Sequence, residues 1–250
     1  TGLPLIYVNL IGGQDGLVFD GASFVLSADN RLLAKARAWT EDLLITKWTQ
    51  DGDGWACAEG GIATEPKGDE AIYQALVLGL RDYVGKNAFP GVLIGLSGGI
   101  DSALTAIVAT DALGPSKVHC IVMPSPFTSA ESMEDAAEVA GLLGVQLDTI
   151  DIGPAMKAFD EMLKVKFAGR DADTAEENIQ ARARGITLMA LSNKFGHMVL
   201  STGNKSEMSV GYAPLYGDMG GGYSVLKDVY KTAVFALSRW RNQSRPDGAA

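Results

Sequence analysis

The stretch LIGLSGGIDSALTAI, residues 93–107, is an apolar run that breaks at Ser-Gly-Gly and then resumes with helical character. Gly98 and Gly99 allow the backbone to turn tightly and expose several N–H groups, and Ser97 and Ser102 add hydroxyl donors. All of these groups precede the positive end of the expected helix, where an anion is favoured. The stretch therefore predicts a strand, a phosphate-binding turn and a helix, although it lacks the Gly-Lys-Ser/Thr ending of the common nucleotide-binding loop.

Asp101 is the most informative residue of this turn. A carboxylate beside a phosphate cradle makes chemical sense if it holds Mg²⁺. The alternative is an ordinary glycine-rich turn in which Asp101 and Ser102 only cap the helix. The complete pattern Ser-Gly-Gly-Ile-Asp-Ser after an apolar strand favours phosphate binding.

Further apolar strands follow at a nearly constant spacing. Strands that begin near residues 92, 118 and 145 are 26–27 residues apart, which is typical of right-handed β-α-β units in a parallel sheet. We predict an α/β fold, a doubly wound parallel sheet, with strands at 91–96, 117–123, 145–151 and 197–201. The loops that leave the carboxyl ends of these strands are expected to face one cleft.

Helical patterns separate the strands. An apolar stripe begins at Asp69, and Thr128 with Glu131 can form a capping box for a helix that ends at Gly144. The other predicted helices are 101–113, 154–166, 175–195 and an amphipathic helix that begins near Lys231.

The first part of the chain has a different pattern. Residues 3–10 and 17–26 are β-rich, the turn GGQDG at 12–16 separates them, and 31–48 could hold a further strand pair. Residues 49–70 are rich in Gly and Asp without periodicity, which predicts a linker or an exposed loop. We expect a short β-rich piece at 1–48, a linker at 49–68 and the α/β domain at 69–250.

Composition excludes several classes of function. A net charge of −9 without a run of basic residues argues against nucleic acid as the main partner. No apolar stretch approaches the roughly 20 residues of a membrane span, and no leader precedes the first strand, so we expect a cytoplasmic protein with no membrane partner. Cys57 and Cys120 are far apart and form no C-x-x-C pair, which fits a reducing compartment. Because Thr1 is not an initiator Met, the chain is expected to be cut from a longer protein.

The motifs along the chain resemble one family. Ser-Gly-Gly-x-Asp-Ser is similar to the signature of the ATP pyrophosphatase (PP-loop) superfamily. The segments ENIQARARGITLMALSN (177–193) and LSTGNKSEMSVGYAPLYGDMGGGYSVLKDVYKT (200–232) closely resemble the glutamine-dependent NAD⁺ synthetases. The opening YVNLIGGQDGLVFDGASFV (7–25) is similar to the end of the nitrilase-like glutaminase domain of that family.

This resemblance implies a fold and a reaction. The fold would be the adenine nucleotide alpha-hydrolase type, preceded by the remnant of a nitrilase-like domain. The enzyme would be a carbon-nitrogen ligase that converts deamido-NAD⁺ (nicotinic acid adenine dinucleotide) to NAD⁺. The nicotinate carboxylate takes AMP from ATP with release of pyrophosphate, and ammonia, normally derived from glutamine, then displaces AMP. A loop that holds pyrophosphate as a leaving group explains the absence of the usual lysine.

The resemblance also assigns site residues, with ATP and Mg²⁺ as cofactors. Asp101, Glu207 and Lys231 would be catalytic, and Asp101 and Glu207 would hold the metal. The ATP-binding residues would be Gly95, Leu96, Ser97, Gly98, Gly99, Ile100, Asp101, Ser102, Thr202 and Lys231. The deamido-NAD⁺-binding residues would be Asn178, Arg182, Glu207, Tyr212, Ala213, Pro214, Leu215 and Asp218.

Alternatives to several of these assignments stay open. Lys231 and Lys205, a further phosphate-binding candidate, could be solvated surface charges. Asn178 and Arg182 lie at i and i+4 on one helix face, which could simply be an exposed polar cluster. His119, His197 and Cys120 are interpreted as structural, and Cys57 is a poor candidate for a nucleophile.

Departures from the family pattern limit the expected activity. The nucleophilic Cys of the glutaminase and its Glu and Lys partners belong upstream of residue 1, so we expect no glutamine hydrolysis by this chain. A downstream segment with a further substrate-binding Lys is also absent. Pro126 stands where Arg is common and Pro214 where Thr is common, and both could weaken nucleotide contacts.

Two other functions remain as alternatives. One is another PP-loop amide ligase, such as a GMP or asparagine synthetase, against which TGNKSE and LYGDMGGG count. The other is a non-catalytic ATP-binding fragment, which the missing downstream segment favours. The family resemblance further implies a homo-oligomer for the full-length protein.

Overall fold

The computed structural model of the chain describes residues 2–52, 54–171, 173–212 and 214–244. The chain forms two compact units, residues 1–83 and 84–250. The helix α1 (Asp69–Lys86) begins in the first unit and ends in the second. Among the described helices, none is long and apolar enough to cross a membrane.

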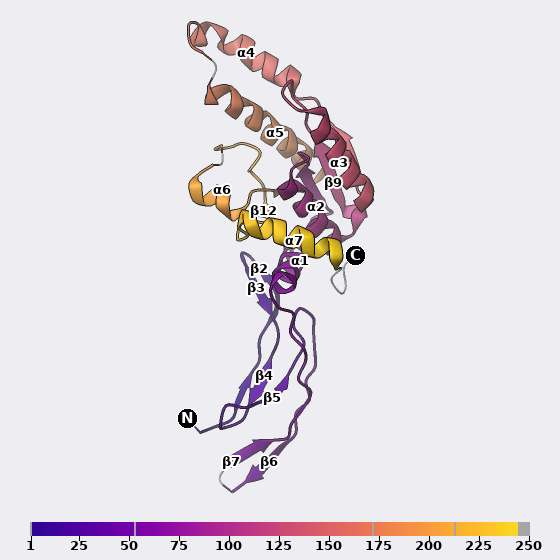
Figure 1. Cartoon of the computed structure of the whole chain (residues 1–250), viewed down its shortest axis with the longest axis vertical. Coiled ribbons are helices and arrows are strands. Elements are labelled where there is room, and N and C mark those ends of the chain that lie inside the picture. Colours follow the sequence, from indigo (N-terminus) through magenta and orange to yellow (C-terminus); the bar gives the residue numbers. More distant parts are fainter. Residues whose placement is uncertain (1, 53, 172, 213, 245–250) are drawn as a thin grey trace. The chain divides into compact units, whose positions relative to one another are not determined.

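A five-stranded parallel sheet forms the centre of the second unit (Figure 1). The strands in spatial order are β10 (Gln146–Thr149), β9 (Val118–Val122), β8 (Val92–Gly95), β11 (Met198–Ser201) and β12 (Tyr223–Ser224). The chain enters the sheet at β8, moves outward through β9 to β10, and then returns to the other side of β8 as β11, which pairs with β12. This order confirms the predicted doubly wound α/β fold, and the reversal beside β8 is where such sheets bind ligands.

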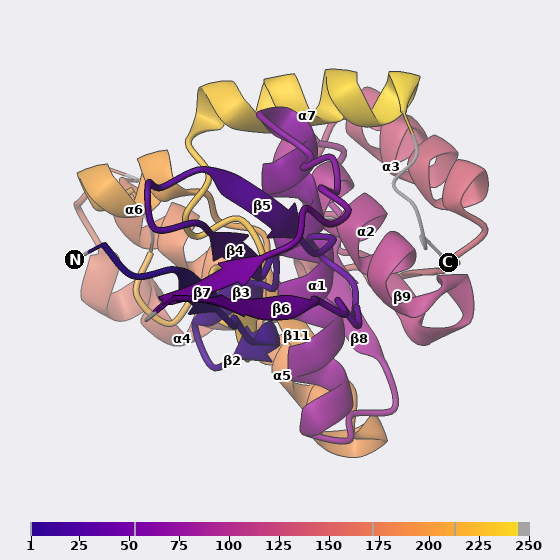
Figure 2. The same cartoon turned by 90° about the horizontal axis from the view of Figure 1, so that it is seen from below.

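Helices cover both faces of this sheet. The helices α2 (Ile100–Leu113), α3 (Ala130–Leu143) and α7 (Lys231–Gln243) pack together on one side, with α7 along α2 (Figure 2). The other side carries α5 (Thr174–Phe195), which packs on β8 and β11, and α4 (Gly153–Phe167), which packs on α5. Successive side chains of a strand point to opposite faces of the sheet. On the face that α5 covers, Leu93, Ile121 and Val199 bury their side chains against Leu188 of this helix.

Most helix and strand boundaries in the second unit agree with those predicted from the sequence. Gly144 and Gly196 end α3 and α5 in the left-handed conformation, with φ of 65° and 75°. The expected capping box of Thr128 and Glu131 is wrong, because Ser129 caps α3 by accepting from the N–H of Ser132. Three short elements were not expected, namely the 3₁₀ turn η1 (Pro115–Lys117), α6 (Lys205–Val210) and β12.

The first unit is β-rich, as expected. It contains one antiparallel sheet and two hairpins. The sheet is β1 (Leu5–Tyr7), β4 (Phe24–Leu26) and β5 (Leu32–Lys35), and the hairpins are β2 (Ile11–Gln14) with β3 (Leu17–Asp20) and β6 (Trp48–Asp51) with β7 (Gly54–Cys57). A small core of Val25, Leu33 and Ala34 holds the sheet together.

Several strand predictions in this unit are wrong in detail. The turn at 12–16 is tighter, because Gly12 and Gly13 pair as strand residues and only Asp15 and Gly16 turn. The expected strand 17–26 is broken at Gly21 and Ala22, whose φ values of 74° and 49° no strand adopts. Of the range 31–48, Leu32–Lys35 is a strand and Trp48 opens β6, so the expected strand pair is not formed.

The range 49–70 is not wholly irregular, since it holds most of the hairpin β6–β7. Aromatic Trp48 and half-buried Cys57 pack on the core of the unit, which stabilises a segment with little strand periodicity. The domain boundaries at 48, 49, 68 and 69 stay predictions.

Candidate active site

The turn after β8 is held by its own serines. The N–H of Ser97 donates to Oγ of Ser102 at 3.2 Å, and this hydroxyl donates to the carbonyl oxygen of Gly99 at 2.9 Å. Gly98 has a φ of +80°, and a Cβ there would lie only 2.9 Å from Cα of Ser132 and closer still to its carbonyl oxygen. The signature therefore needs glycine at this position because the backbone of α3 approaches it closely.

Asp101 does not cap α2. Among the described residues no side chain caps this helix, whose N-cap is Gly99, so its first N–H groups stay available to an anion. Oδ1 of Asp101 instead accepts from Nδ2 of Asn204 at 2.9 Å, and Oδ2 pairs with Nζ of Lys231. The alternative reading of Asp101 as a helix cap is therefore wrong.

Glu207 is held by the same asparagine. The N–H of Asn204 donates to Oε2 of Glu207 at 3.0 Å, and the N–H of Glu207 donates to Oδ1 of Asn204 at 3.1 Å. This reciprocal pair is a capping box at the start of α6. Asp101 and Glu207, which the resemblance assigns to one metal, thus share Asn204 as a hydrogen-bond partner.

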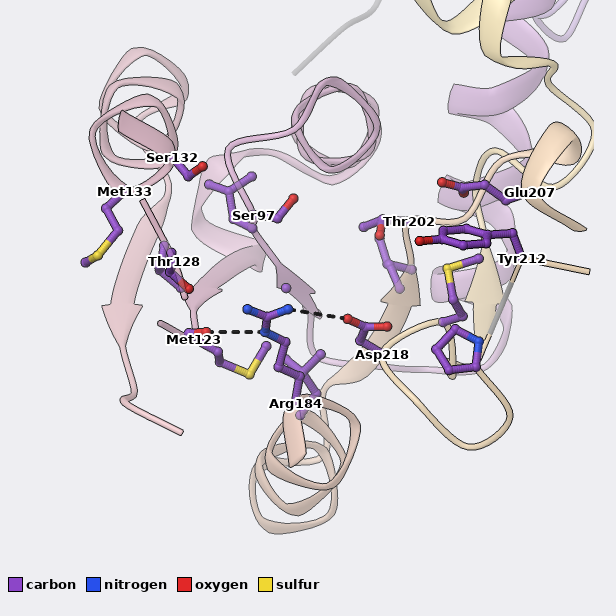
Figure 3. A pocket seen from close by; sticks show the side chains of 17 residues that line it. Ser97, Met123, Thr128, Ser132, Met133, Arg184, Thr202, Glu207, Tyr212 and Asp218 are labelled. Carbon is purple, nitrogen blue, oxygen red and sulfur yellow. Dashed lines mark hydrogen bonds and ion pairs between the residues drawn. The ribbon is translucent and has the colours of Figure 1, made fainter. Parts of the chain in front are cut away.

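A cavity of about 270 Å³, here called the first cavity, opens at the carboxyl ends of β8, β9 and β11 (Figure 3). Its lining is Gly95, Leu96, Ser97, Val122, Met123, Thr128, Ser132, Met133, Arg184, Leu188, Leu200, Thr202, Glu207, Tyr212, Pro214, Asp218 and Met219. Four predicted ATP-binding residues, Gly95, Leu96, Ser97 and Thr202, are among them. The later residues of the loop, 98–102, and Lys231 are not.

A second cavity of about 750 Å³ lies beside α5 and α6. It is lined by Thr174, Glu177, Asn178, Gln180, Ala181, Arg182, Gly211, Tyr212, Pro214, Leu215 and Asp218. Every predicted deamido-NAD⁺-binding residue lines it except Glu207, which lines the first cavity, and Ala213, which lies outside the described residues. Tyr212, Pro214 and Asp218 line both cavities, so the two share a wall.

The loop that carries this wall is docked closely on α5. Nε of Arg182 donates to the carbonyl oxygen of Leu215 at 3.1 Å. A Cβ on Gly185 would lie 2.7 Å from the carbonyl oxygen of Gly217, so the helix has a glycine where the loop crosses it. Arg182 therefore both lines the second cavity and holds the loop in place.

Arg184 was not predicted, although among the described residues it is the only basic side chain in the lining of the first cavity. Nε donates to the carbonyl oxygen of Met123 at 3.3 Å, and Nη1 lies 3.9 Å from Oδ2 of Asp218, as the dashed lines in Figure 3 show. A sequence signal exists, because Arg184 lies at i−4 and i−7 from Leu188 and Leu191, on the apolar stripe of α5.

Burial changes the ionisation of this pair. It raises the pKa of the Asp218 carboxyl; Arg184 opposes the rise and the like charge of Glu207 adds to it. Burial also lowers the pKa of Arg184, and Asp218 works against that effect. Asp218, which lies in the wall shared by the two cavities, is therefore partly desolvated, and the neighbouring charges act on it strongly.

The two lysines have different surroundings. Lys231 begins α7, donates its backbone N–H to Oγ of Ser206 at 3.0 Å and pairs its side chain with Asp101. Nζ of Lys205 instead lies 4.8 Å from the ring centroid of Tyr230. Lys231 is beside the phosphate loop and is not simply a solvated charge, whereas the described contact of the Lys205 side chain is with Tyr230.

The donor set can be compared with the needs of Mg²⁺. Among the described residues no group of three or more His, Cys, Asp and Glu side chains could hold a metal alone. Mg²⁺ in nucleotide sites is usually held by one or two carboxylates together with phosphate oxygens. Asp101 and Glu207, linked through Asn204, fit a metal that arrives with a triphosphate.

Two of the remaining titratable candidates, His119 and Cys120, lie in structural surroundings. His119 Nε2 lies 2.8 Å from a carboxylate oxygen of Asp148 on the neighbouring strand. Burial raises the pKa of the Cys120 thiol to about 12, which leaves it inert at neutral pH. Cys57 and Cys120 are free thiols.

Fold and site together define a class of protein, the α/β domains of the PP-loop type. In this chain the Ser-Gly-Gly-x-Asp-Ser turn follows the strand beside which the strand order reverses. The first cavity, which this turn lines in part, shares a wall with the second cavity. The sequence model of the NAD synthase family matches residues 72–247. The chain belongs to the NAD synthase family.

Individual relatives agree with this assignment. A glutamine-dependent NAD⁺ synthetase of Rhodobacter capsulatus is 50% identical over 242 residues, which are 97% of this chain and 44% of that protein. The structure of glutamine-dependent NAD⁺ synthetase from Acinetobacter baumannii, in complex with ADP, matches 99% of this chain and 47% of that one, with a TM-score of 0.91 and 48% identity. An NMN synthetase structure from Francisella tularensis matches 71% of this chain and 72% of that one, with a TM-score of 0.65 and 30% identity. The chain spans less than half the length of the glutamine-dependent relatives.

Proposed function

We propose that the chain catalyses the ATP-dependent amidation of deamido-NAD⁺ to NAD⁺, with release of AMP and pyrophosphate. The observation that carries this proposal is the wall shared by the two cavities. Gly95, Leu96 and Ser97 of the phosphate loop line the first cavity, and most of the residues assigned to deamido-NAD⁺ line the second. A reaction that joins ATP to a second nucleotide needs two adjacent sites that meet at the reacting atoms.

In the first step an oxygen of the nicotinate carboxylate attacks the α-phosphorus of ATP, and the bond to the bridging oxygen of pyrophosphate breaks. The N–H of Gly98 and the N–H groups at the N-terminal end of α2 would hold the departing anion. Lys231 would add a point charge on the phosphates. Its pairing with Asp101 beside the loop supports this role.

Asp101 and Glu207 would hold Mg²⁺, which when bound neutralises the charge that develops on pyrophosphate. Each carboxylate would use the oxygen that is not bonded to Asn204. Lys231 would then leave Asp101 for the phosphates, so that both positive charges act on the triphosphate.

In the second step the nitrogen of ammonia attacks the acyl carbon, the carbon–oxygen bond to AMP breaks, and the amide nitrogen loses a proton. AMP leaves with the electron pair of that bond. Water competes with ammonia for such an acyl adenylate. Met123, Leu188 and Leu200 give the first cavity an apolar lining that would limit the entry of water.

We also propose that glutamine normally supplies the ammonia through a part of the protein outside this chain. The naming of the longer relatives as glutamine-dependent supports this. A cytoplasmic location and a homo-oligomeric full-length enzyme remain part of the proposal, and size-exclusion chromatography with light scattering would measure the oligomeric state.

The test is to supply the chain with ATP, Mg²⁺, deamido-NAD⁺ and either ammonium or glutamine, and to measure NAD⁺ and AMP. NAD⁺ from ammonium but not from glutamine is the expected result. Parallel reactions with nicotinic acid mononucleotide and with xanthosine monophosphate test the other amide ligases. Thermal stabilisation by ATP and Mg²⁺ without any product would indicate a non-catalytic ATP-binding fragment instead.

A variant separates the first step from the second. Asp101→Asn is expected to abolish exchange of labelled pyrophosphate into ATP in the presence of deamido-NAD⁺, while circular dichroism stays unchanged. Asp135→Asn, an exposed carboxylate on α3, is the matched control and should retain exchange. Normal exchange by Asp101→Asn would contradict the assignment of Asp101 to the reaction.

A further inference from the structure

Asn204 is a fully buried polar residue that directly precedes α6. It makes three hydrogen bonds to two acidic residues. Its side-chain Nδ2 donates to Asp101, its Oδ1 accepts from the N–H of Glu207, and its backbone N–H donates to the Glu207 carboxylate. One residue therefore contacts both of the carboxylates assigned above to Mg²⁺.

The N-cap role explains only part of this arrangement. A capping box uses the side-chain oxygen and the backbone N–H of the N-cap residue, and Ser, Thr or Asp can provide both. Among the good N-cap residues only Asn adds an NH₂ donor. In this chain the NH₂ group of Asn204 donates a hydrogen bond to Asp101, which lies 103 residues away in sequence.

In each of the two carboxylates, Asn204 bonds one oxygen and leaves the other to a different partner. Asn204 holds Oδ1 of Asp101, while Oδ2 pairs with Lys231. Asn204 also holds Oε2 of Glu207, which leaves Oε1 for a ligand. One oxygen of each group is thus fixed, and the rotation of the carboxylate about its last bond is restricted.

We propose that Asn204 is a positioning residue that orients Asp101 and Glu207 toward a common Mg²⁺–pyrophosphate ligand. The inference rests on the proposed function, since it assumes that both carboxylates serve the metal. Groups that orient metal ligands typically change metal affinity by about 10- to 100-fold when they are removed.

The experiment uses Asn204→Ser and Asn204→Thr, which keep an N-cap oxygen but lose the donor to Asp101. The thermal stabilisation of the chain by saturating ATP is measured along a Mg²⁺ titration. Both variants are expected to need about 10- to 100-fold more Mg²⁺ for half of the full effect. Stabilisation by ATP without Mg²⁺ should be close to that of the wild type.

A matched control comes from the capping box of α5, where Asp173 accepts from the N–H of Ala175 and pairs with Glu176. Asp173→Ser makes the same kind of change at another helix start. It should leave the Mg²⁺ requirement unchanged.

A double variant tests whether Asn204 acts through Asp101. In an Asp101→Asn background, Asn204→Ser should have almost no further effect on the Mg²⁺ requirement. An independent, additive effect would overturn the proposal, because it would show that Asn204 works by another route.

The outcomes separate this inference from the proposed function. A wild-type Mg²⁺ requirement in Asn204→Ser and Asn204→Thr would leave Asn204 as a helix cap only and overturn the inference alone. Failure of both variants to fold would also overturn it, because Asn204 would then be a structural residue of α6. If ATP stabilisation of the wild type does not depend on Mg²⁺, the metal assignment in the proposed function fails together with the inference.

Discussion

Gly98→Ala should damage the protein far more than Gly99→Ala, although the two glycines are neighbours in the same signature. At Gly98 the backbone has a φ of +80°, which costs an L-residue about 1–2 kcal/mol. A Cβ there would also collide with the carbonyl oxygen of Ser132 and lie 2.9 Å from its Cα. Forcing such an overlap typically costs about 1–3 kcal/mol, and main-chain atoms of a helix cannot turn away as a flexible side chain can.

Gly99 provides the matched control. Its φ is −80°, and the nearest atom to a Cβ would be Oγ of Ser97 at 3.3 Å. A serine hydroxyl can rotate, so Gly99→Ala should cost less than about 1 kcal/mol.

Urea unfolding followed by circular dichroism measures the difference. Gly98→Ala is expected to lose on the order of 2–5 kcal/mol, which lowers the unfolding midpoint by about 1–2 M for a typical denaturant dependence. Equal midpoints for the two variants, or a loss below about 1 kcal/mol for Gly98→Ala, would refute the argument from close approach.

Three further predictions follow from the same unit. Asp111→Asn removes the charge partner of Arg241, whose Nε and Nη2 lie 2.6 and 2.8 Å from a carboxylate that is 2% exposed, and urea unfolding should show a loss of about 3–5 kcal/mol. Gly185→Ala should push away the loop at Gly217 and raise the KM for deamido-NAD⁺ in steady-state kinetics while ATP-induced stabilisation stays nearly constant; an equal loss of both would contradict the role of the loop. Burial raises the pKa of Asp218 above its ordinary 3.8, so the folded chain binds more protons than the unfolded chain between 3.8 and the raised value, and stability falls as the pH rises through that window. Asp218→Asn should remove this pH dependence of stability. The urea midpoint of the variant, relative to that of the wild type, should therefore rise from about pH 4 upward. Parallel pH profiles of the two midpoints would contradict the prediction.

The sequence alone predicted the parts of the fold that depend on local signals. The spacing of the apolar strands predicted the parallel sheet, and Gly144 and Gly196 marked helix ends because each lies in the left-handed conformation. The predictions were weaker in the first unit. There Gly21 breaks an apolar run, and Trp48 with Cys57 brings a hairpin into a segment without periodicity.

The residues of the candidate site also fall into some that the sequence indicated and some that it did not. The glycines of the turn and Asp101 were proposed from the residues themselves, because their types and order predict phosphate and Mg²⁺ binding, whereas Glu207 was proposed from the family resemblance. Arg184 was missed, since its contacts with the carbonyl oxygen of Met123 and the carboxylate of Asp218 join residues that are far apart in the sequence.

What the sequence by itself determined is therefore the kind of protein: a doubly wound sheet with a phosphate turn of the NAD synthase family. Only the tertiary structure decided that Asp101 pairs with Asn204 and Lys231, from which it is separated by 103 and 130 residues. The physical reason is that periodicity and turn chemistry act over a few residues, whereas hydrogen bonds of this kind form only after the strands have stacked their carboxyl ends along one edge.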